Sequence, residues 1–151
     1  MTGRTVGQID VSQCASEARA EESGECLFCA EIGPRIFLEN DGAVAIRDAF
    51  PASELHTLVI PKRHAVTALD LSPEEAAACH ELILRVCADI RRLDRSVSGF
   101  NIGANAGRDA GQSVFHCHYH VIPRRPQDSG SDLGGIRHAM PGRRIFPGDY
   151  L

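Results

Sequence analysis

The feature that most constrains this chain is a row of three histidines at alternate positions, His116, His118 and His120. Successive side chains of a β-strand point to opposite faces of its sheet, so this segment predicts a strand that carries all three imidazoles on one face. The positions between and beside them hold Phe115, Cys117, Tyr119 and Val121, which suit a packed face. Because a row of imidazoles buries little apolar surface, we expect the histidine face to be a functional site.

Composition limits the classes of protein to consider. The chain has 151 residues, enough for one domain with a real core, and 43% hydrophobic with 24% charged residues is ordinary for a globular protein. The net charge of −4 argues against a nucleic-acid-binding surface. No apolar run reaches membrane-spanning length, and the N-terminus lacks the apolar core of a signal peptide. We therefore expect a cytoplasmic protein that binds neither nucleic acid nor a membrane.

Cys26 and Cys29 form a Cys-x-x-Cys pair, which allows two thiolates on one turn to reach a single ion. A redox dithiol and two small buried residues are the alternatives. Two thiolates leave a tetrahedral zinc with two ligands to find, and His64 and one histidine of the row are the available donors. A catalytic zinc held by the row itself would leave the cysteine pair unused, so we favour a closed structural site.

Regular elements are predicted around these motifs. Ser72, Pro73 and Glu75 have the pattern of a helix N-terminus with a capping box, and apolar residues from Cys79 to Leu93 recur at helical spacing. Asp48, at the end of an apolar run, is predicted to be a turn residue. Short apolar runs predict strands at residues 35–38, 43–46, 55–61 and 98–104.

The glycine-rich turn at residues 105–111 leads directly into the histidine row. Glycines allow the backbone N–H groups of such a turn to surround a phosphate, although they suit a plain loop equally well. An uncharged imidazole is one of the few side chains that form covalent intermediates, and beside backbone donors its natural electrophile is phosphorus. A Walker lysine motif is absent, which makes a nucleotide kinase or ATPase improbable on sequence grounds.

These motifs resemble the histidine triad (HIT) family of nucleotide hydrolases and transferases. The similarity includes residues 111–124 around the histidine row and the segment Leu58–His64, while the Cys26–Cys29 pair resembles the start of zinc-containing bacterial members. The resemblance covers residues 26–126 as a HIT domain. It leaves residues 1–25 as a flexible tail and residues 127–151 as a C-terminal tail packed on the domain.

The resemblance implies an α+β fold with an antiparallel sheet, one long helix and shorter ones, in a homodimer. It implies that His118 attacks the α-phosphorus of a nucleotide and that His120 orients the phosphate and the leaving group. The ligands of a structural Zn²⁺ would be Cys26, Cys29, His64 and His116. The nucleotide-binding residues would be Asp48 at the ribose hydroxyls and Asn105, Gly111, Gln112, Ser113, His118 and His120 at the phosphate.

The expected activity is hydrolysis through a nucleotidyl-histidine, with nucleoside phosphoramidates, acyl-nucleotides or dinucleoside polyphosphates as substrates. The nucleotide would be a purine nucleotide and the product of the AMP type. A nucleotidyltransferase or phosphorylase and a non-catalytic nucleotide-binding module are the alternatives. In having histidine at position 120, the chain resembles the hydrolase branches of the family. Leu55 stands where many relatives have glycine, and His56 beside it is expected to be structural.

Overall fold

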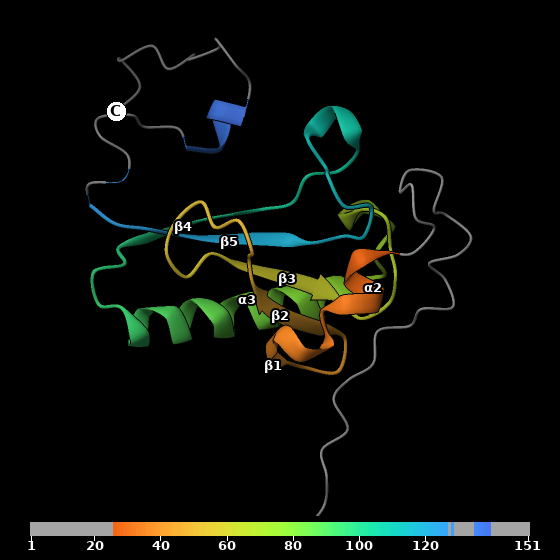
Figure 1. The fold of residues 1–151 in the computed structure, drawn as a ribbon, viewed down its shortest axis with the longest axis horizontal. Helices are drawn as coiled ribbons and strands as arrows, with labels where there is room; N and C mark the ends of the chain where they lie inside the picture. The colour runs from red at the N-terminus through yellow and green to blue at the C-terminus, as the bar shows by residue number, and fades with distance from the viewer. Residues whose placement is uncertain (1–25, 127, 129–134, 140–151) are drawn as a thin grey trace, which may run out of the picture.

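The computed structural model describes residues 26–126, 128 and 135–139. The predictions for the two tails therefore fall largely outside the described residues. Within them, five strands form one antiparallel sheet in the order β1-β2-β3-β5-β4 (Figure 1). The strands are β1 (Ile36–Glu39), β2 (Ala43–Arg47), β3 (Thr57–Pro61), β4 (Gly99–Gly103) and β5 (Tyr119–Arg124).

Helices flank the sheet on both faces. The predicted α+β arrangement, an antiparallel sheet with one long helix and shorter ones, is confirmed. The α-helices are α2 (Leu27–Glu31) and α3 (Pro73–Leu93), and the 3-10 helices are η2 (Gly33–Arg35), η3 (Ala68–Asp70), η4 (Arg108–Ala110) and η5 (Gly135–Ala139).

Helix α3 begins where the sequence predicts. The Ser72 hydroxyl accepts a hydrogen bond from the Glu75 N–H at 3.2 Å, and the Glu75 carboxylate accepts one from the Ser72 N–H at 2.8 Å. The same carboxylate pairs with the guanidinium of Arg63, which is the main reason that the pKa of Glu75 is lowered to about 2. These contacts tie the start of α3 to the residue that precedes His64.

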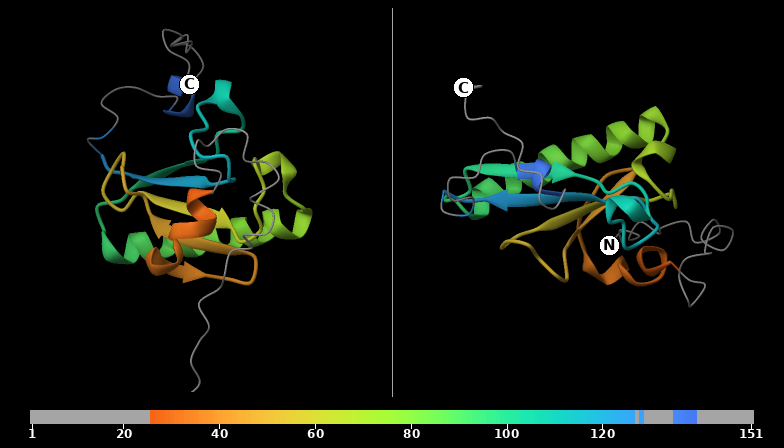
Figure 2. Two further views of the ribbon diagram at one scale, coloured as in Figure 1. Left: turned by 45° about the vertical axis from the view of Figure 1, so that its right-hand side comes forward. Right: turned by 90° about the horizontal axis from the view of Figure 1, so that it is seen from above.

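Helix α3 lies along one face of the sheet (Figure 2, right), and its apolar stripe packs against that face. Leu93, in the last turn of the helix, departs from the predicted stripe and is 55% exposed. The buried core on this face comes from Ala43, Ala45, Val59 and Val121 of the sheet, Cys79, Leu82, Ile83, Val86 and Ile90 of the helix, and Val97.

The opposite face of the sheet is divided between a second core and a polar region. Helix α2 and the residues around it cover β2 and β3 through Cys26, Phe28, Ile32, Val44, Ile46, Leu58 and Ile60. Leu58 pairs with His120 of β5, and His120 pairs with Gly103 of β4, so this face becomes polar one strand beyond the apolar cluster. None of the described helices is long and apolar enough to cross a membrane.

The histidine segment is less regular than predicted, because β5 begins at Tyr119 and only His120 lies within the strand. Ladder pairing with β3 is confined to Thr57–Val59, opposite Val121–Tyr119. Continuing the pairing toward His116 would bring the chain opposite Pro61, which has no N–H to donate. Instead, the Cys117 N–H donates to the Ala65 carbonyl at 2.6 Å. The prediction of a strand through all three histidines was therefore wrong at its start.

Candidate functional site

The four predicted metal ligands converge near the start of β5. Nδ1 of His116 lies 3.5 Å from Sγ of both Cys26 and Cys29, and Nδ1 of His64 lies 3.5 Å from Sγ of Cys29. One ligand atom from each residue falls within 4.8 Å of all the others. Two sulfurs and two imidazole nitrogens at this spacing form the donor set of a tetrahedral structural zinc site.

The surroundings of this cluster also fit a metal. His116 is fully buried, and its second ring nitrogen, Nε2, donates to the carbonyl of Pro61 at 2.9 Å. Such a bond fixes the ring and leaves Nδ1 as the ligand atom. The sulfur of Cys29 is disulfide-bonded in the structure, so binding of a metal here requires its reduction.

His118 is held with one nitrogen available for chemistry. Its Nδ1 lies 2.8 Å from the carbonyl oxygen of His116, and a carbonyl can only accept, so Nδ1 carries the proton. The lone pair of the neutral ring is therefore on Nε2. The ring packs edge-on against Phe28, at 5.3 Å between centroids, and against His120, at 5.1 Å. This arrangement is that of a positioned nitrogen nucleophile.

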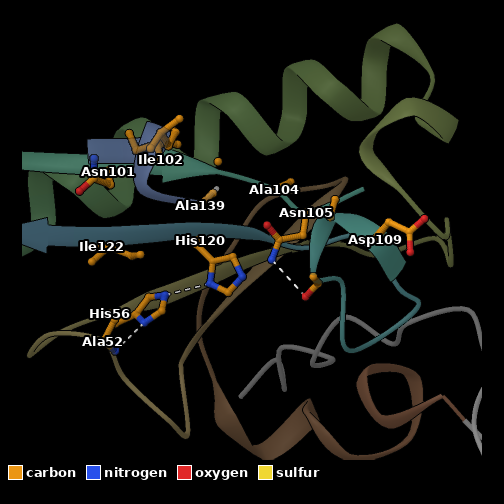
Figure 3. Close-up of a pocket in the computed structure, with 14 residues that line it drawn as sticks. Ala52, His56, Asn101, Ile102, Ala104, Asn105, Asp109, His120, Ile122 and Ala139 are labelled. Carbon is orange, nitrogen blue, oxygen red and sulfur yellow. Dashed lines mark hydrogen bonds between the residues drawn. The ribbon is translucent and has the colours of Figure 1, made fainter. Parts of the chain in front are cut away.

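His120 and His56 form a hydrogen-bonded pair (Figure 3). Nδ1 of His56 accepts from the Ala52 N–H at 3.0 Å, so the neutral His56 ring carries its proton on Nε2. That nitrogen lies 3.0 Å from Nδ1 of His120, which therefore accepts, leaving the His120 proton on Nε2. Burial and the nearby His118 and His56 imidazoles lower the pKa of His120 to about 4, so at neutral pH it is an uncharged hydrogen-bond donor.

Asp48 combines the two roles considered from the sequence. Its Oδ1 accepts from the Phe50 N–H at 2.9 Å, as expected of a turn residue. Its Oδ2 faces the site, 3.5 Å from Nδ1 of His56 and 4.0 Å from Nδ1 of His120. Burial lowers the pKa of His56 while Asp48 raises it, and burial is the larger effect. A neutral His56 leaves Oδ2 of Asp48 able to accept a ligand hydroxyl.

The glycine-rich turn is organised from within by Gln112. The Gln112 side chain accepts from the Gly107 N–H at 2.8 Å and donates to the carbonyls of Val66 and Val114. Gly107 and Gly111 have φ of 93° and 85°, a backbone conformation that favours glycine. Gln112 is buried and shapes the turn through these bonds, whereas Gly111 and Ser113 are exposed.

A cavity of about 780 Å³ opens beside His120. Its walls come from β4, β5, the segment between β2 and β3, the glycine-rich turn and η5, and they carry both polar and apolar side chains (Figure 3). Asn105 reaches toward the carbonyl of Gly111 at 3.5 Å on one side of it. The lining residues include His56, Asn101, Asn105, Asp109, His120 and Ile122.

Two residues of the site were missed or undervalued by the sequence analysis. His56 was expected to be structural, but it contacts His120 directly, and a single histidine before a strand carries no signal of that contact. Leu55, which precedes it, has φ of 68°. An L-residue in this left-handed conformation is strained, so glycine would suit the position better. Leu55 compensates by packing against the α3 core.

The chain is similar to several known proteins. A family model described as HIT domain matches residues 30–127. An uncharacterized HIT-like protein of Mycobacterium tuberculosis is 40% identical over 115 residues, which cover 74% of this chain and 79% of that protein. A protein of Arabidopsis thaliana named adenylylsulfatase HINT3 is 36% identical over 131 residues, which cover 80% of this chain and 66% of that protein.

Solved structures show the same similarity. A zinc-bound histidine triad family protein from Mycobacterium smegmatis has a TM-score of 0.64 and 35% identity, with 76% of this chain and 87% of that chain covered. A hypothetical histidine triad nucleotide-binding protein from Sulfolobus tokodaii has a TM-score of 0.63 and 34% identity, with 68% of this chain and 71% of that chain covered.

The strain at Leu55 predicts an unusual order of stability. Leu55→Ala and Leu55→Gly both lose the packing against the α3 core, but only alanine keeps a Cβ in the left-handed conformation. We expect the glycine variant to be the more stable by about 1 kcal/mol in denaturant unfolding. The exposed helical position Ala77 is the control, because Ala77→Gly should destabilise by about 1 kcal/mol. An alanine variant at Leu55 as stable as the glycine variant would contradict the strain.

Proposed function

Because this chain belongs to the HIT domain family, we propose that it hydrolyses nucleotides at the α-phosphorus through a nucleotidyl intermediate on His118. The observation that carries the proposal is the hydrogen bond from His118 Nδ1 to the His116 carbonyl, which leaves the Nε2 lone pair for attack. The name of the Arabidopsis relative, adenylylsulfatase, supports an adenylyl compound as the substrate class. Nucleotide binding is the coarser property that the family shares with its solved members.

Each step of the proposed reaction is assigned to a described residue. The Nε2 lone pair of His118 forms a bond to phosphorus as the bond to the leaving group breaks. His118 Nδ1 keeps its proton and donates it in a hydrogen bond to the His116 carbonyl, so this bond stabilises the charge that develops on the ring. Water then attacks phosphorus, the N–P bond breaks, and the electron pair returns to Nε2 with release of the nucleoside monophosphate.

The residues around His118 supply binding and orientation. Nε2–H of His120 donates to the bridging atom of the leaving group, and His56 holds it in the tautomer that can do so. Oδ2 of Asp48 accepts from the ribose hydroxyls. Gly111, Ser113 and Asn105 line the phosphate, and Gln112 contributes by shaping their turn.

A structural Zn²⁺ belongs to the same proposal. The zinc-bound Mycobacterium smegmatis structure supports it, as does the pairing of two cysteines with two histidines. Cys26, Cys29, His64 and His116 would hold the ion, whose contribution is to fix the start of the histidine segment and not to bind substrate. Since His116 is both a ligand and the acceptor for His118, the ion would order the nucleophile indirectly.

We further propose a homodimer formed at β4. Among the described residues, β4 pairs with β5 on one side only, which leaves its other edge able to add a strand. Ile102 on this strand is 40% exposed, an apolar side chain at an otherwise unpaired edge.

The nucleophile assignment predicts a loss of turnover without a loss of binding. His118→Ala should lower kcat by at least about 1000-fold, because it removes the nitrogen proposed to bond to phosphorus. Affinity for the monophosphate product should stay within about 3-fold, measured by calorimetry. His80→Ala on the exposed face of α3 is the control. Loss of binding comparable to the loss of turnover would contradict the assignment.

The same assay separates the alternatives. A transferase or phosphorylase would transfer nucleotide from the trapped enzyme to phosphate or an alcohol faster than to water. A non-catalytic module would bind nucleotide and release no monophosphate from phosphoramidate, acyl-nucleotide or dinucleoside polyphosphate substrates.

Metal analysis tests the zinc site. Protein purified under reducing conditions should contain one zinc per chain, and Cys26→Ser should lose it with a large fall in melting temperature, because a structural zinc contributes about 10 kcal/mol to folding. Cys87→Ser, a half-buried thiol on α3, should keep the metal. The same zinc content in Cys26→Ser and the wild type would exclude these ligands.

Sedimentation equilibrium tests the dimer. The wild type should have the mass of two chains at micromolar concentration, and Ile102→Arg should shift it toward one chain because a charge at the edge opposes strand pairing. A wild-type mass of one chain would remove the dimer from the proposal.

A further inference from the structure

A second cavity continues the first along β5, on the side away from His118. It has a volume of about 490 Å³ and shares Ala52, Asn101 and Ile122 with the cavity beside His120. The two cavities adjoin along β5 because His120, Ile122 and Arg124, at alternate positions of the strand, point to the same face. Together the two cavities form a groove that begins at His120 and reaches Arg124, about 13 Å along the strand.

Arg124 closes the far end of this groove, and among the described residues much of its guanidinium has no close acceptor. Its hydrogen bond goes from Nη1 to Oδ1 of Asn101 at 2.6 Å, and its contact with Oδ2 of Asp128 is long, at 3.9 Å. The neighbouring Arg125 differs, because its Nε and Nη2 both bind the carboxylate of Asp94, at 3.0 and 2.7 Å. Arg125 is thus committed to the fold, whereas Arg124 can bind a further acceptor.

The groove lies where the leaving group of the proposed reaction has to go, and in this respect the inference rests on the proposed function. Displacement at phosphorus is in line, so the leaving group departs opposite the attacking Nε2 of His118. His120 follows His118 along the chain and donates to the bridging atom, and beyond His120 lies the groove. Phe28 packs against the His118 ring and belongs to the apolar cluster under α2, outside the groove.

We propose that Arg124 is a specificity-determining residue that binds an anionic group on the substrate's leaving half, so that the preferred substrates are nucleotides whose leaving group is an extended anion. The shared chemistry is a carboxylate or a phosphate, since both match the planar fork of a guanidinium. Acyl-nucleotides with a second carboxylate and dinucleoside polyphosphates satisfy this requirement. A simple uncharged leaving group does not.

Displacement of the leaving group by His118 needs no reactant other than the substrate. The His118 Nε2–phosphorus bond forms, the phosphorus–oxygen bond to the leaving group breaks, and that oxygen keeps the electron pair and departs as an oxyanion. A leaving group of this kind needs no proton at departure, which suits a His120 that donates a hydrogen bond and keeps its proton. Arg124 takes no part in these bond changes and acts on binding and orientation alone.

Acidic side chains on the groove explain why the subsite should select an extended anion and reject a short one. Asp109 lines the end near His120, and Glu54 and Asp128 line the end near Arg124. Asp128 accepts from the Arg125 N–H at 2.8 Å, so its carboxylate is held in a turn beside Arg124. An anion that reaches the guanidinium replaces the long contact with Asp128, and one that stops short meets Asp109 without compensation.

The experiment compares two adenosine 5′-phosphate aryl esters of the same shape, one with a 4-carboxylate and one with a neutral 4-carboxamide. Arg124→Gln should lower kcat/KM for the carboxylate about 10- to 100-fold, the range for a hydrogen bond to a charged group, and leave the carboxamide within about 2-fold. Asp128→Asn, which removes the competing carboxylate, should shift the preference further toward the charged ester. Arg92→Gln on exposed α3 should change neither.

Diadenosine tetraphosphate is the second substrate to be compared. The effect of Arg124→Gln on its hydrolysis shows whether the subsite recognises a phosphate chain as well as a carboxylate. An equal effect of Arg124→Gln on both aryl esters, or no effect on either, would overturn the subsite while the proposed function stands. The proposed function would instead be overturned if the wild type released no adenosine monophosphate from either ester, or if its release did not depend on His118. Arg124→Lys, which keeps the charge without the fork, should retain part of the preference and guards against a folding defect.

Discussion

The contact on which the rest of the site depends is the hydrogen bond between Nδ1 of His118 and the carbonyl of His116. It sets the tautomer of one histidine through the backbone of another. His116 is itself fixed on both ring nitrogens, by the carbonyl of Pro61 and by the sulfurs of the cysteine pair. A single buried residue, His116, therefore links the metal-type cluster to the ring of His118.

The division of the sheet explains how an apolar fold leaves room for such a site. Helix α3 packs on one face against β1, β2, β3 and β5, and the short α2 covers only part of the other. Between the apolar cluster and the β4 edge, the open face carries His120, Asn101 and Arg124 in place of a core. His120 is held there through His56 by the Ala52 N–H, whereas Arg124 can bind a further acceptor.

Much of the fold could be predicted from local signals, because each element has a strong one. Ser72 and Glu75 form the predicted capping box, and the alternation of apolar residues placed the strands within a few residues of their ends. The four cysteine and histidine ligands also lie together as expected. These predictions succeeded because capping, periodicity and ligand chemistry are encoded at short range or by residue type.

The errors have a common cause in long-range contacts. The start of β5 depends on Pro61 and Ala65, which are distant in sequence from the histidines they oppose. The importance of His56 depends on a partner 64 residues away, and the inward use of Gln112 depends on Val66. The strain at Leu55 comes from its backbone conformation, which a leucine in the sequence does not reveal. Pairings of this kind are visible only in the folded chain.

The central claim is that Nε2 of His118 is the nitrogen that bonds to phosphorus. The most direct measurement is ³¹P–¹⁵N NMR coupling in the trapped nucleotidyl enzyme, prepared with ¹⁵N-labelled histidine. The account predicts a single coupling to Nε2 of His118, with Nδ1 still protonated. Phosphorus bonded to Nδ1 of His118, or to His120, would contradict it.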